Sequence, residues 1–143
     1  MKAAILFGLL AVAGCSGGDF PIVATFTGSN ATPAVGSGYS APLGMATQVG
    51  DVLTLTSTAG GATLLVTLEV PVLGQINVSE RHLSVEYTLG TGGSAAGWAS
   101  NSGSITFETL DPFKVTFNKI EMIAATSGAT GAFFLGGTAS FAK

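Results

Sequence analysis

Apolar and polar residues alternate along most of the chain after residue 20, which is the two-residue period of a strand with one buried face. The clearest case runs from Val52 to Val70, where two alternating arms flank Ala59-Gly60-Gly61, a turn that tolerates positive φ. This pattern predicts a β-hairpin. Its buried face would carry Leu53, Leu55 and Ser57 from the first arm and Leu64, Val66, Leu68 and Val70 from the second.

Further strands are expected over residues 20–27, 83–89, 98–110, 113–122 and 131–141. In the second of these, Leu83, Val85, Tyr87 and Leu89 are predicted to face inward. Residues 28–51 are rich in Gly, Ser, Pro and Ala, with weak strand character over 39–47, so they predict an irregular excursion. Residues 74–77 predict a loop or a short strand.

The alternation changes phase once inside the expected strand 113–122. Phe113, Val115 and Phe117 share one face, but the next apolar residues are Ile120 and Met122. A one-residue β-bulge at Asn118-Lys119 would return all five side chains to a single buried face. Gly136-Gly137 inside the last strand indicates a second bulge or bend.

These elements predict an all-β fold, because helical periodicity is scarce and about seven to eight strands are joined by short turns. An antiparallel β-sandwich and a small barrel both fit this pattern. We expect a single domain over residues 20–143.

The first fifteen residues predict a targeting signal. Lys2 precedes an uncharged, mostly apolar run over residues 3–13, which is shorter than the ~20 residues of a membrane-spanning helix. The run ends in Val12, Ala13, Gly14 and Cys15, and this segment resembles the lipobox of bacterial lipoproteins, an aliphatic residue and two small residues before Cys. The alternative is an ordinary secretory signal with an incidental Cys nearby.

The lipobox resemblance implies a signal peptide over residues 1–14 and a lipidated tether over residues 15–19. Cys15 would carry a diacylglycerol thioether, with Val12, Ala13 and Gly14 recognised by the signal peptidase. The membrane would then be a partner through the lipid anchor. Ser16, where an Asp would favour the inner membrane, implies the outer membrane of a Gram-negative bacterium.

The later chain resembles a group of small, uncharacterised β-rich envelope lipoproteins. The resemblance rests on residues 20–28, on the turn-forming segment 103–111 and on Gly131-Ala132-Phe133-Phe134. Val115-Thr116-Phe117 stands where that group has Gly-Thr-Phe. The group has no assigned activity, so the resemblance implies fold and localisation alone.

The amino-acid composition and the charge argue against several classes of protein. The chain has 143 residues, 47% of them hydrophobic and 9% charged, with a formal net charge of −3. High hydrophobicity with low net charge argues against disorder. Five Lys and Arg residues, spread along the chain, form no basic patch for nucleic acid. One Cys and one His exclude a disulfide framework and the usual Cys/His zinc site.

Two pairs of titratable residues could in principle carry acid–base chemistry. Glu80 and His82 lie where a loop enters a strand, which is more typical of a solvated turn. Glu108 and Asp111 lie three residues apart around a turn, where Asp111 before Pro112 has a turn-forming role. We therefore expect no catalytic residues, no metal site and no cofactor.

Trp98 is the strongest candidate for ligand contact, together with Asn101 and Tyr87. An exposed Trp beside polar amides can stack on a sugar ring, whereas a half-buried Trp would plug one end of the fold. The sequence therefore predicts a non-enzymatic binding or structural module with an envelope protein or a glycan as partner. The alternatives are a lipocalin-like carrier of an apolar ligand and a sugar-binding module that uses Trp98.

Overall fold

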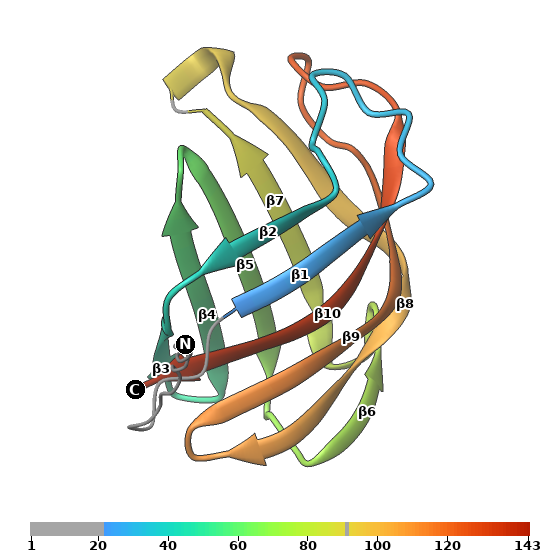
Figure 1. The fold of residues 1–143 in the computed structure, drawn as a ribbon. Coiled ribbons are helices and arrows are strands. Elements are labelled where there is room, and N and C mark those ends of the chain that lie inside the picture. Colours follow the sequence, from blue (N-terminus) through green and yellow to red (C-terminus); the bar gives the residue numbers. More distant parts are fainter. Residues whose placement is uncertain (1–21, 91) are drawn as a thin grey trace, which may run out of the picture.

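The computed structural model describes residues 22–90 and 92–143, and this part of the chain is built from strands (Figure 1). Two single-turn 3-10 helices, η2 (Glu80–His82) and η3 (Gly92–Ser94), interrupt them. The strands are β1 (Ile22–Thr27), β2 (Gly38–Ala41), β3 (Gly44–Val49), β4 (Val52–Ala59), β5 (Ala62–Glu69), β6 (Gly74–Asn77), β7 (Ser84–Leu89), β8 (Ala96–Leu110), β9 (Phe113–Ala124) and β10 (Ala132–Ala142).

Seven of these strands close into a barrel in the order β3, β4, β5, β7, β8, β9 and β10. The strand β10 completes the ring, because one of its edges pairs with β9 and the end of the other pairs with β3. Neighbouring strands run antiparallel except at this β10–β3 contact, where Phe141 pairs with Gly44 in parallel. The all-β prediction is confirmed, and of its two architectures the barrel is the one that forms.

The remaining strands lie outside the ring. The strand β1 pairs with the other part of the β10 edge and carries β2 on its far side, and β6 pairs with β8 beyond the end of β7. The prediction of seven to eight strands was therefore too low. The strands beyond that number are β2 and β3, which form in the stretch 28–51 expected to be irregular, and β6, which forms where a loop or a short strand was expected. All three are short, and pairing with a neighbour decides their conformation where intrinsic strand propensity is weak.

The expected bulge in β9 is confirmed. Ile120 pairs with Leu135 and Phe117 pairs with Gly137, so β9 carries one residue more than β10 between these pairs. Lys119 has a φ of 47°, a left-handed conformation that accommodates the extra residue. Ile120 and Phe117 consequently both point into the core.

The bulge or bend predicted at Gly136-Gly137 in the last strand coincides with an unusual backbone conformation at Gly137. Its φ is 98°, and a Cβ atom there would lie 2.9 Å from the Cα of Ala24 in β1. Only Gly fits this combination of positive φ and close backbone approach.

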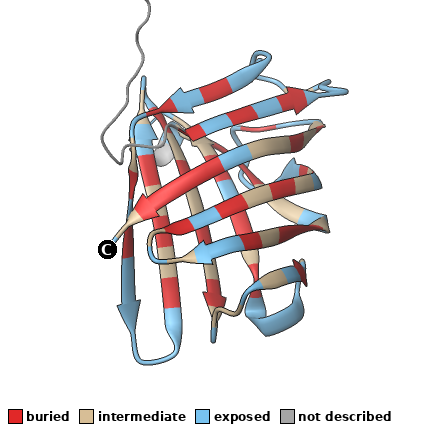
Figure 2. Ribbon diagram, turned by 60° about the horizontal axis from the view of Figure 1, so that its bottom comes forward, coloured by how far each residue is buried: buried red, intermediate tan, exposed pale blue. Residues whose placement is uncertain are grey.

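The core follows the predicted alternation, which Figure 2 shows as buried and exposed bands along the strands. Leu53, Leu55 and Ser57 of β4 are buried, as are the corresponding Leu64, Val66 and Leu68 of β5. The prediction that Val70 is buried on this face is wrong, because the residue is 46% exposed. Its φ of 52° turns the chain out of the strand directly after Glu69.

The described residues contain no helix long and apolar enough to cross a bilayer. Val12, Ala13, Gly14 and Cys15, together with Phe20 and Pro21 of the first expected strand, lie outside the described residues.

Candidate functional site

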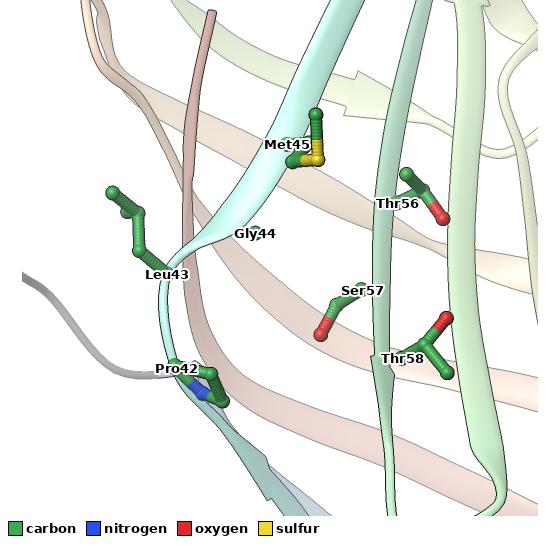
Figure 3. Close-up of a pocket in the computed structure, with 7 residues that line it drawn as sticks. All are labelled: Pro42, Leu43, Gly44, Met45, Thr56, Ser57 and Thr58. Carbon is green, nitrogen blue, oxygen red and sulfur yellow. The ribbon is translucent and has the colours of Figure 1, made fainter.

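A surface pocket of about 250 Å³ opens beside the start of β3 (Figure 3). One wall is the bend between β2 and β3, and the other is the last part of β4. The lining residues are Pro42, Leu43, Gly44, Met45, Thr56, Ser57 and Thr58. Its volume lies below the ~300 Å³ at which pockets for drug-sized ligands begin, so the pocket suits a small group or one side chain.

The pocket exists because β3 and β4 separate beyond Met45. Met45 still pairs with Thr56, but the β3 chain then turns toward β10, where Gly44 pairs with Phe141. A Cβ atom on Gly44 would lie 2.9 Å from the carbonyl oxygen of Thr56 and 2.8 Å from a ring carbon of Phe141. Gly44 therefore lets β10 close the barrel while the β4 edge beyond Thr56 loses its partner strand.

The pocket combines an apolar rim with hydroxyl groups. The Met45 side chain is 67% exposed at the rim. The buried Ser57 hydroxyl lies 3.0 Å from the Tyr39 hydroxyl of β2, and the Thr58 hydroxyl lies 3.3 Å from that of Thr63. The Ser57–Tyr39 contact ties the β1–β2 pair to the barrel wall.

Trp98 and Tyr87 are brought together, but inside the core. They are direct cross-strand partners on β8 and β7, with ring centroids 6.5 Å apart, and their exposed fractions are 1% and 3%. The Trp98 indole nitrogen donates a hydrogen bond to the carbonyl of Thr130 at 3.4 Å. Stacking on a sugar needs an exposed ring face, so neither ring is placed to bind one.

The rings of Tyr87 and Trp98 belong to an aromatic cluster in the core. The ring centroid of Phe133 lies 5.9 Å from that of Tyr87 and 5.8 Å from that of Trp98. The ring centroid of Phe26 lies 4.9 Å from that of Tyr87. Burial raises the pKa of the Tyr87 phenol above its usual value of 10.0, and the nearby Tyr39 adds to the shift. This cluster joins β1 and β2 to the wall formed by β7, β8 and β10.

Asn101 lies apart from the two rings. It is exposed on β8, where its amide donates a hydrogen bond to a carboxylate oxygen of Glu121 on β9 at 2.8 Å. The three residues predicted to contact a ligand therefore form no common surface.

The residues considered for acid–base chemistry contact other partners in the structure. His82 binds Glu69 rather than Glu80, at 2.9 Å between Nδ1 and Oε2, and its side chain is 80% exposed. Glu80 instead accepts a hydrogen bond from the backbone N–H of Asn77 at 2.8 Å. Glu108 accepts one from the Thr116 hydroxyl at 3.1 Å. None of these groups lines the pocket.

Within residues 22–90 and 92–143, no three His, Cys, Asp or Glu side chains gather as a metal ion would require. The pocket was missed from sequence because its walls come from a Pro-Leu-Gly bend and a strand edge, and neither has a distinctive motif. Comparison of the chain with protein-family models, with curated proteins and with solved structures finds no match.

Proposed function

We propose that this protein is a lipid-anchored module of a bacterial envelope that acts by binding or by structural support rather than by catalysis. The observation that carries the proposal is Cys15, the only Cys of the chain, which ends a segment resembling a lipobox and lies seven residues before the start of β1. Acylation of this thiol would attach the barrel to the outer membrane of a Gram-negative bacterium.

The length of the tether supports an anchored role. The seven-residue step from Cys15 to Ile22, which contains the tether, spans at most about 25 Å when fully extended. Ser16-Gly17-Gly18-Asp19 has the composition of a flexible chain. The barrel would therefore remain in contact range of the lipid surface.

The chemistry of the pocket supports binding over catalysis. Activating a Ser or Thr hydroxyl as a nucleophile requires a base within hydrogen-bond reach. The Ser57 and Thr58 hydroxyls instead contact those of Tyr39 and Thr63. His82, the only His of the chain, is bound to Glu69 outside the pocket.

Metabolic labelling with an alkyne fatty acid tests the anchor. When the full chain is expressed in a Gram-negative host, we expect the label to be incorporated and the protein to pellet with membranes. Cys15→Ser should abolish the labelling, because the only thiol that can form the thioether is gone. Ser16→Ala is the matched control and should retain the label.

Mass spectrometry of the N-terminal peptide completes the test. The proposal predicts a mature chain that begins at Cys15 and carries acyl groups. An unmodified N-terminus at any other residue would instead assign residues 1–14 to an ordinary secretory signal and refute the anchor.

A further inference from the structure

Seven large apolar residues are exposed in the described part of the chain, and four of them lie on one part of the barrel. These four residues, which we call the apolar stripe, lie on β3, β4 and the chain just after β5, with exposed fractions between 44% and 75%. They are Met45, Val49, Val52 and Val70.

Strand pairing and the β3–β4 turn place Val49, Val52 and Val70 next to one another, and Met45 lies four residues further along β3. Val49 and Val52 are direct partners across the β3–β4 turn. The Val70 backbone N–H donates a hydrogen bond to the carbonyl of Asp51, next to Val52, at 2.7 Å. Met45 lies on the same outer face of β3 as Val49, since Ala46 between them is buried. Thr47, which is exposed on the same face, lies between Met45 and Val49, so the stripe is apolar at its two ends and carries one hydroxyl between them.

The stripe begins beside the point where the chain departs toward Cys15. The strands β1 and β3 follow one another along a single edge of β10, because Val23 pairs with Thr138 and Gly44 pairs with Phe141. At about 3.3 Å per residue, these two contacts on β10 lie about 10 Å apart. Figure 1 places β3 and the C-terminal end of β10 on the same side of the barrel.

Charges of both signs border the stripe. Arg81 donates a hydrogen bond to the Val70 carbonyl at 3.1 Å, and Lys143 follows Ala142, the partner of Met45. Asp51 lies in the β3–β4 turn, and Glu69, the cross-strand partner of Val52, contacts His82 at 2.9 Å. This balance imposes no large electrostatic cost on approach to zwitterionic phospholipid, and the two cations can meet headgroup phosphates.

We propose that the apolar stripe rests in the headgroup region of the bilayer that anchors the chain. This inference depends on the proposed function, because the short tether from Cys15 keeps this side of the barrel near the lipid. Exposed Val and Met side chains are stabilised there by leaving water. The lipid anchor and the stripe would together fix the orientation of the barrel, with the β9–β10 loop directed away from the membrane.

Fluorescence quenching in vesicles tests this orientation. The lipidated full chain is reconstituted in phosphatidylcholine vesicles that contain doxyl-labelled lipid. Because acylation blocks Cys15, Val49→Cys supplies one free thiol for a bimane label. Ser127→Cys is the matched control, since it is exposed in the loop between β9 and β10, at the end of the barrel away from β3 (Figure 1). We expect at least twofold stronger quenching at position 49 than at position 127.

Flotation of each labelled variant with the vesicles separates the two proposals. If the protein floats and both positions are quenched equally, the stripe does not face the lipid, although the anchor stands. Weak quenching at position 49, together with labelled chains that an amine-reactive reagent cross-links to one another, would assign the stripe to a second copy. A chain without acyl groups that does not float would overturn both the anchor and the orientation.

Discussion

The buried hydroxyl pair between Tyr39 and Ser57 provides the sharpest test of how β2 is held on the barrel. The two oxygens lie 3.0 Å apart, and both residues are 6% exposed. Tyr39→Phe keeps the aromatic ring against Tyr87 but removes the hydroxyl, and Ser57→Ala removes the other partner. Either change leaves one buried hydroxyl without its present contact.

The magnitude follows from the surroundings of Ser57. A buried polar group that loses its partner costs about 1–3 kcal/mol. Ser57 lines the surface pocket, so water can reach the remaining hydroxyl, and we expect the lower end of that range, about 1–1.5 kcal/mol for each single variant. In the double variant Tyr39→Phe/Ser57→Ala no hydroxyl is left unpaired. Its loss in free energy of unfolding should therefore be about 1 kcal/mol smaller than the sum of the single losses.

Urea unfolding of the full chain in a Cys15→Ser background measures these differences. Trp98 is the only Trp and is 1% exposed, so its fluorescence reports on unfolding of the core. The exposed hydroxyl pair Thr58–Thr63, 3.3 Å apart, is the control and should show additive alanine substitutions. Coupling between Tyr39 and Ser57 below about 0.3 kcal/mol would refute the hydrogen bond, since distant sites add within that range.

Two further predictions concern the core and the bulge. The unfolded chain releases the Tyr87 proton near pH 10, whereas the folded chain retains it to higher pH. Stability should consequently fall as pH rises above 10, and Tyr87→Phe should flatten that fall in urea midpoints measured between about pH 8 and pH 11. A decline of equal slope in the variant would contradict the burial effect. At the β9 bulge, Lys119→Val should destabilise the protein by about 1 kcal/mol more than Lys119→Gly in urea unfolding, because Lys119 has a φ of 47° and a β-branched residue resists that conformation. Equal stabilities would show that the bulge adopts another backbone conformation.

Much of the strand layout could be predicted from the sequence, because alternation is a local property. The period of two assigned the inward faces of β4, β5, β7 and β9, and the phase shift at Asn118-Lys119 located the bulge without knowledge of the neighbouring strands. Val70 was expected to be buried but is exposed, because its φ of 52° ends the strand. The alternation of apolar and polar residues carries no information about this φ.

The candidate site was less predictable. The inward orientation of Ser57 followed from the pattern, but its place in a pocket depends on Pro42, Leu43 and Gly44 leaving β4 to reach β10. Trp98 had two compatible environments from sequence alone. Burial was decided by Tyr87 and Phe133, which come from other strands and surround its ring.

The sequence by itself determined the all-β class, the faces of the main strands and the position of the bulge, and its resemblance to a lipobox predicts an anchor. Barrel closure was decided only by the tertiary structure. Alternation states which face of a strand is buried and carries no information about which strand lies at its edge. Here one edge of β10 is shared by β1 and β3, which are separated along the chain by β2. That shared edge closes the barrel, opens the pocket and sets the apolar stripe beside the point where the chain leaves toward Cys15.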